Sequence, residues 1–149
     1  MLQPFCRCQT SVRAAQDTFN LMGKIIRINS DGSIPADNPY ASNGLGNAAV
    51  WSYGHRNPQG LVLDKTTGRL YSHEHGAKGG GELNLIKPDT NYGWPAVTKG
   101  VNYSGAYVTP LRSAPGVEDP LTFWDPSIGA SGLAIYEGDA FPDWPGKLF

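Results

Sequence analysis

Residues 54–73 read GHRNPQGLVLDKTTGRLYSH and contain two short apolar runs on either side of a turn signal. The first run, 61–63, precedes a polar segment that contains glycine, and residues 69–73 then alternate in the period of two expected of a strand. Two such runs joined by a short polar turn are typical of a β-hairpin. The sequence therefore predicts a hairpin, with Arg56 and Asn57 directly before its first strand.

The segment after this hairpin, residues 74–81, is rich in glycine. Glycine permits positive φ and close backbone approach, so carbonyl oxygens in this loop can point at a hard cation. Calcium fits such donors better than zinc, because Cys6 and Cys8 lie far in sequence from the histidines. The alternative is a flexible surface loop, since glycine-rich turns are common. We expect the segment to leave the hairpin at the end opposite Arg56, and to border the same cavity only if a neighbouring loop returns there.

Two histidines and the arginine admit more than one interpretation. His73 and His75 project to the same face of an alternating segment, one as a strand residue and the other as a loop residue. The pair alone does not predict a metal site. Arg56 is either a cation of a ligand site or a surface arginine paired with a carboxylate.

Linked motifs in a fixed order carry a resemblance to a known family. They read GHRNPQGL at 54–61, EHG at 74–76, GELNLI at 81–86 and NYGWP at 91–95. Further matches are GKIIRIN at 23–29, DGSIP at 31–35, DNP at 37–39, PSI at 126–128 and SGL at 131–133. Over roughly residues 13–149, the chain resembles the soluble quinoprotein glucose and aldose sugar dehydrogenases, the glucose/sorbosone dehydrogenase family. Residues 1–12 fall outside the resemblance, and we expect a disordered leader in which Cys6 and Cys8 are free thiols.

The resemblance implies an all-β fold, a partial six-bladed β-propeller with roughly two to three blades of antiparallel strands. Composition agrees, because the chain has 19 glycines and 12 prolines and its best helical window, 12–22, is short. The hairpin pattern that starts at Gly60 recurs from Gly132, which indicates repeated blades, although two unrelated hairpins are the alternative. We expect strands near 24–28, 61–63, 70–73, 83–86 and 133–136.

Members of this family oxidise the anomeric carbon of aldoses and pass a hydride to pyrroloquinoline quinone (PQQ). By similarity, Arg56 and Asn57 contact the quinone, and the arginine stabilises the negative charge that grows on its oxygen. Trp124 and Ser127 lie where the family lines the quinone pocket. The implied partners are an aldose and an electron acceptor that the sequence does not name.

The resemblance also implies calcium. The carbonyls of Gly76 and Ala77 would hold the ion that clamps PQQ, and Glu82 with the Tyr92 carbonyl would hold a second, structural ion. Candidates for a further position are Thr98, Gly100 and Asn102.

Several residues depart from the family pattern. Alanine replaces a proline of some members at Ala77, Asn102 replaces a carboxylate ligand, and residues 129–130 read GA where AP is more frequent. The general-base histidine of the family lies before the matched region, and its late lysine and arginine contacts to PQQ lie after Phe149. We therefore expect the chain alone to be inactive. The alternative function is a non-catalytic calcium- or sugar-binding module, or a remnant of one.

Charge and hydrophobicity exclude other classes of partner. The net charge is −1 and no lysine or arginine cluster is present, which argues against nucleic acid and anionic membrane surfaces. No apolar run has the length of a membrane span. The start of the chain lacks a signal-peptide pattern, yet the resemblance implies a periplasmic or secreted parent. An arc of a propeller leaves apolar faces and strand edges uncovered, so we expect either that the chain is a truncated reading frame or that it self-associates through blade edges.

Overall fold

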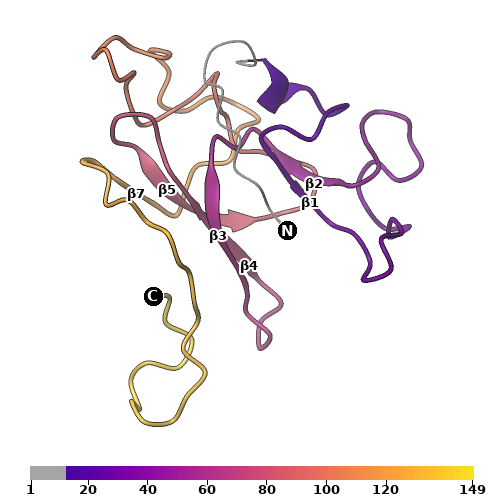
Figure 1. Cartoon of the computed structure of the whole chain (residues 1–149), viewed down its shortest axis with the longest axis vertical. Helices are drawn as coiled ribbons and strands as arrows, with labels where there is room; N and C mark the ends of the chain where they lie inside the picture. Colours follow the sequence, from indigo (N-terminus) through magenta and orange to yellow (C-terminus); the bar gives the residue numbers. More distant parts are fainter. Residues whose placement is uncertain (1–12) are drawn as a thin grey trace.

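The computed structural model describes residues 13–149, in which long loops connect short β-strands and the regular secondary structure is almost entirely β (Figure 1). A short 3-10 turn, η1 (Ala14–Gln16), precedes strands β1 (Lys24–Ile26), β2 (Val50–Tyr53), β3 (Pro58–Leu63), β4 (Leu70–Glu74), β5 (Gly81–Ile86), β6 (Thr90–Asn91) and β7 (Thr122–Trp124). The predicted all-β class is confirmed. Within residues 13–149, no helix has the length and apolar character needed to cross a membrane. The expectations for residues 1–12, with Cys6 and Cys8, lie outside the described part of the chain.

Strands β3 and β4 form the predicted antiparallel hairpin. Its turn is stabilised locally, because the Asp64 carboxylate accepts hydrogen bonds from the backbone N–H groups of Thr66 (2.9 Å) and Thr67 (3.2 Å). The register pairs Pro58 with Glu74. The expectation that the glycine-rich segment leaves the hairpin at the end opposite Arg56 is therefore wrong. In an antiparallel pair, the start of the first strand and the end of the second strand lie side by side.

The strands belong to two sheets (Figure 1). One is a four-stranded antiparallel sheet in the order β3-β4-β5-β7, which is the size of one propeller blade. The other has the order β1-β2-β6, with β1 and β2 antiparallel but β2 and β6 parallel over two residue pairs. The prediction of antiparallel strands is confirmed for the first sheet and for the β1–β2 pair, while the short parallel strand β6 was not predicted.

The second copy of the hairpin pattern is only partly a strand pair. The predicted strand at 133–136 is reduced to an isolated bridge between Ile135 and Leu148. The neighbouring residues Ala134 and Phe149 exchange two further backbone hydrogen bonds, of 2.8 and 2.9 Å. This bridge is nevertheless equivalent in sequence to the pair formed by Leu63 and Leu70 in the first hairpin. The same pairing recurs at both positions, as expected for repeated blades.

The apolar core lies between the two sheets. Ile25 of β1, Ile86 of β5 and Tyr92 are buried together, and Trp51 and Leu70 pack against them. Because these residues come from both sheets, burial of their apolar surface fixes how one sheet lies on the other. The segments that connect β2 to β3 and β5 to β6 lie at this contact region between the two sheets, which we call the seam.

The outer faces of the first sheet stay open. Leu61 and Leu63 of β3 are 50% and 51% exposed, and Phe123 of β7 is 49% exposed. Beyond β7 the chain first passes along β4 and then ends in a loop that extends away from the sheets (Figure 1). Exposed apolar side chains on a blade-sized sheet agree with the uncovered faces expected of an arc of a propeller.

Candidate functional site

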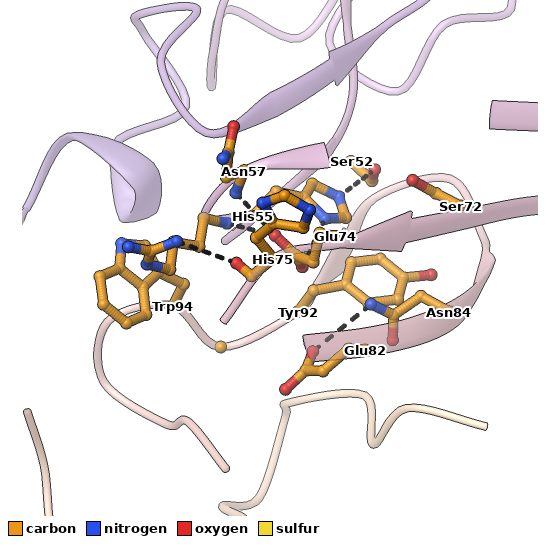
Figure 2. A network of polar contacts seen from close by, with 12 residues as sticks. Ser52, His55, Asn57, Ser72, Glu74, His75, Glu82, Asn84, Tyr92 and Trp94 are labelled. Atoms are coloured by element: carbon orange, nitrogen blue, oxygen red, sulfur yellow. Dashed lines mark hydrogen bonds and ion pairs between the residues drawn. The ribbon is translucent and has the colours of Figure 1, made fainter. Parts of the chain in front are cut away.

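Glu74, the last residue of β4, holds the loop that precedes β3. Its side chain is buried, with 5% exposure, and Oε2 accepts hydrogen bonds from the backbone N–H groups of Arg56 (2.6 Å) and Asn57 (2.9 Å) (Figure 2). A buried carboxylate is stable only when it is well hydrogen-bonded. This contact therefore ties the arginine loop to the end of β4.

His55 extends the contact into the other sheet. Its Nδ1 lies 3.5 Å from Oε1 of Glu74, and its Nε2 lies 2.9 Å from Oγ of Ser52 on β2. The imidazole also stacks on Tyr92, with ring centroids 4.6 Å apart. Ser52 is fully buried, so this Ser-His-Glu series has no access for a substrate and is not a hydrolytic site.

Arg56 carries a guanidinium group at the edge of a small pocket. Its Nη1 donates a hydrogen bond of 3.1 Å to the carbonyl of His75, and its guanidinium carbon, Cζ, lies 5.3 Å from the ring centroid of Trp94. Its Nε is buried without a hydrogen-bond partner among residues 13–149. A fixed cation with an unused donor suits an anionic ligand.

The pocket gathers several residues that the sequence singled out. Its walls are formed by Arg56, Glu74, His75, Gly76, Gly80, Glu82, Tyr92, Trp94, Val97 and Thr98. Five predicted site residues thus border one space, namely Arg56, Gly76, Glu82, Tyr92 and Thr98. Six others are not part of these walls, namely Asn57, Ala77, Gly100, Asn102, Trp124 and Ser127.

Glu82 faces Glu74 across the β4–β5 pair. Desolvation and then the neighbouring Glu74 charge raise the pKa of Glu82 to about 8, and the hydrogen bond from Asn84, 3.4 Å long, offsets little of this. Two buried carboxylates without a cation repel each other, and a hard cation would relieve both costs. The donors therefore fit calcium. In the described range, no three acidic, histidine or cysteine side chains are placed to hold a metal ion by themselves, so carbonyl oxygens would have to complete the coordination.

The glycine-rich loop is closely packed. A Cβ at Gly76 would lie 2.0 Å from the carbonyl oxygen of Gly79, and a Cβ at Gly80 would lie 2.2 Å from the backbone nitrogen of Gly100. Gly79 and Gly80 also have positive φ, 76° and 66°. These glycines are buried, so the alternative of a flexible surface loop is wrong for them. Close backbone approach is what they provide.

His73 and His75 bind backbone rather than metal. Nε2 of His73 lies 2.8 Å from the carbonyl oxygen of Gly132, and Nε2 of His75 lies 2.6 Å from that of Ala130. Both imidazoles therefore reach the same segment, which confirms that they share one face. They hold the chain beyond β7 against β4.

The remaining predicted residues lie around the pocket. Trp124 and Ser127 flank Gly81, since a Cβ there would be 3.8 Å from an atom of each. The Asn57 amide oxygen accepts a hydrogen bond of 2.9 Å from Gln59, and Figure 2 shows this amide directed away from Glu82. Asn102 lies in an exposed turn, where its amide oxygen accepts a hydrogen bond of 2.8 Å from the backbone N–H of Tyr103.

Sequence reasoning missed the residues that support Arg56. Glu74 belongs to the EHG motif at 74–76, but the motif alone predicts no role for it. Sequence reasoning likewise predicted no role for Ser52, His55 or Trp94. The available signal was a glutamate at the end of a half-buried strand, because a carboxylate in such a position needs partners.

Comparison with known proteins identifies the family. The sequence model of the Glucose / Sorbosone dehydrogenase family matches residues 7–149. The aldose sugar dehydrogenase YliI of Escherichia coli K12 is 42% identical over 137 residues, which is 91% of this chain and 37% of that protein. A crystal structure of glucose dehydrogenase superposes with a TM-score of 0.89 at 46% identity, covering 94% of this chain and 41% of the other. The PQQ-bound aldose sugar dehydrogenase of Streptomyces coelicolor gives a TM-score of 0.63 at 35% identity, covering 85% and 32%.

These similarities confirm the predicted fold class, and the chain folds as part of a β-propeller. It spans about a third of the length of the curated relatives it matches, with values of 33% and 37% for two of them. Because the match to the family covers nearly every residue, the chain belongs to the Glucose / Sorbosone dehydrogenase family.

Proposed function

We propose that this chain forms the central part of a quinoprotein sugar dehydrogenase, which oxidises the anomeric carbon of a glucose-like aldose to the lactone with hydride transfer to PQQ. The observation that carries the proposal is the Arg56 guanidinium, held at a pocket edge with a buried Nε that has no hydrogen-bond partner in the described part of the chain. The PQQ-bound relative and the quinoprotein glucose dehydrogenase B of Acinetobacter calcoaceticus support the choice of cofactor. The family resemblance supports action in the periplasm or outside the cell.

The residues of the pocket have separable tasks. When bound, PQQ supplies the acceptor for two electrons and a proton. Arg56 provides a fixed positive charge where negative charge develops, and the face of Trp94 orients its guanidinium. The carbonyls of Gly76 and its neighbour Ala77 would hold the calcium that clamps PQQ. Glu82 and the carbonyl of Tyr92, which border the same pocket, would hold a second, structural calcium.

A PQQ titration of the purified chain, with calcium present and absorbance as the readout, tests this assignment. The unaltered chain should bind PQQ, and Arg56→Ala should weaken binding about tenfold or more, because a charge-assisted contact of ~1.5–3 kcal/mol is lost. Arg69→Ala, on the exposed hairpin turn, is the matched control and should bind normally. Equal binding by both variants would remove Arg56 from the site.

The alternative function is a non-catalytic calcium- or sugar-binding module. It is favoured by the engagement of all three histidines with other groups, which leaves none of them free as a base. Calcium binding without any PQQ binding in the same titration would support this alternative.

Calcium should stabilise the folded chain through Glu82. A ligand present at roughly 100 times its dissociation constant raises the free energy of unfolding by about 2.7 kcal/mol, and Glu82→Ala should remove most of that gain. Thermal unfolding with and without calcium measures it. Glu137→Ala, on an exposed carboxylate paired with Lys65, is the control and should keep the full gain. An equal calcium response in the Glu82 variant would contradict the assignment.

The calcium gain should also depend on pH. Since burial raises the pKa of Glu82 from 4.5 to about 8, the folded chain holds a proton through this range that the unfolded chain releases. Without calcium, the free energy of unfolding should therefore fall as pH rises through that range. Calcium binds the ionised carboxylate, so its stabilising effect should be larger at the upper end of the range than at the lower end.

A further inference from the structure

Arg56 is held at two points by neighbouring residues at the end of β4. Its backbone N–H donates to Oε2 of Glu74 at 2.6 Å, and its Nη1 donates to the carbonyl of His75 at 3.1 Å. One oxygen of Glu74 also accepts the Asn57 N–H at 2.9 Å. The carboxylate therefore sets the direction of the main chain at both residues that precede β3, while the adjacent carbonyl sets the direction of the guanidinium.

The surroundings of Glu74 are built for a negative charge. Two backbone N–H groups point at Oε2, and the His55 imidazole lies 3.5 Å from Oε1. Ser52 supports that imidazole from the other side, and its hydroxyl can donate or accept, so the contact persists in either protonation state of the histidine. Within residues 13–149, the facing carboxylate, Glu82, has a single hydrogen bond, 3.4 Å long, from Asn84. Of the two acidic side chains, Glu74 has the better partners for an ionised form.

These contacts cross the seam between the two sheets. Ser52 lies on β2 and Glu74 on β4, and His55 stands between them with its ring against Tyr92 (Figure 2). Ser52, His55 and Glu74 are all buried, and hydrogen bonds among buried groups hold geometry more tightly than they do in water. A shift of one sheet against the other would therefore move the loop that carries Arg56.

We propose that Glu74 is a positioning residue, which fixes the Arg56–Asn57 loop so that the guanidinium group meets the cofactor in one orientation. The Ser52–His55 pair orients Glu74 in turn. This inference rests on the proposed function, because the cofactor is the anion that Arg56 would meet. Glu74 itself acts through the loop and needs no contact with the cofactor.

A double-mutant cycle on the 149-residue chain tests the proposal. Glu74→Gln should weaken PQQ binding about tenfold in the Arg56 background, because a charged hydrogen-bond acceptor is lost. In the Arg56→Ala background the same change should weaken PQQ binding little further, since the guanidinium that Glu74 positions is already absent. Glu137→Gln is the matched control and should change neither affinity. An equal loss in both backgrounds would overturn the proposal, because Glu74 would then act elsewhere.

A second measurement is independent of cofactor binding, and its first part needs only the unaltered chain. The Arg56 and Asn57 amides of the unaltered chain should be protected from hydrogen exchange, and in Glu74→Gln their proton resonances should shift upfield as the charged acceptor is lost. Rapid exchange of both amides in the unaltered chain would overturn the proposal even if the variant failed to fold. Protected amides that respond to Glu74→Gln in a chain that binds no PQQ would support the positioning role and contradict the proposed function.

Discussion

The 149-residue chain, supplied with PQQ and calcium, should not catalyse the oxidation of glucose coupled to reduction of a dye. Hydride removal from the anomeric carbon requires a base that takes the hydroxyl proton, and such a base contributes about 10²- to 10⁴-fold to the rate. The chain has 3 histidines, and the imidazole of each already contacts another protein group. His55 is buried against Ser52 and Glu74, while His73 and His75 lie within hydrogen-bond distance of backbone carbonyls.

The assay needs a positive control, for which a full-length aldose sugar dehydrogenase under the same conditions is suitable. Loading of the chain with PQQ should be checked by absorbance, so that a lack of turnover is not a lack of cofactor. Robust dye reduction by the chain alone would show that the base has been misjudged. His55 and His75 would then be the residues to replace first, each by glutamine.

Arg56→Ala in a full-length enzyme that carries these same residues should lower kcat by about 10²- to 10³-fold, the usual cost of removing one preorganised donor from developing charge. The expected change is in the chemical step, because the guanidinium contributes most where negative charge grows. The fold should persist, since the group makes one backbone hydrogen bond and one aromatic contact, to His75 and Trp94. Steady-state kinetics and thermal unfolding measure the two effects separately.

The matched variant for this experiment is Arg56→Lys. A lysine keeps the positive charge but loses the planar contact with Trp94, so it should recover only part of the rate. An unchanged kcat in Arg56→Ala would show that charge stabilisation comes from another residue. A large fall in the unfolding temperature would instead make Arg56 a structural residue of the seam.

Local sequence was sufficient for the β3–β4 hairpin and for β1 and β5, but it did not predict β2, β6 or β7. The hairpin of β3 and β4 follows from an apolar run, a turn whose aspartate caps its own backbone, and a second run, all within fourteen residues from Gly60 to His73. The recurrence of this pattern also foretold the bridge between Ile135 and Leu148, though not that it would be so short. Strand length depends on which neighbours cover an edge, and the pattern of one segment carries no information about that.

Motif order was sufficient for the family and for several residues of the pocket. Arg56, Gly76, Glu82 and Tyr92 were selected by motif, and the structure places all four around one space. Their chemical roles stay predictions. The motifs could not show that Ala77 lies outside the pocket walls, because neighbouring residues on a loop can face opposite sides.

The partners of the charged groups were decided only by the tertiary structure. Glu74 meets the Arg56 backbone and faces Glu82 because of the registers of β4 with β3 and β5, which sequence spacing does not specify. His75 is committed to Ala130, 55 residues away. Sequence determined the β3–β4 hairpin with its turn and the strands β1 and β5, since these depend on interactions between near neighbours. Charge partners depend on which distant segments share a desolvated space, and only the packed sheets establish that.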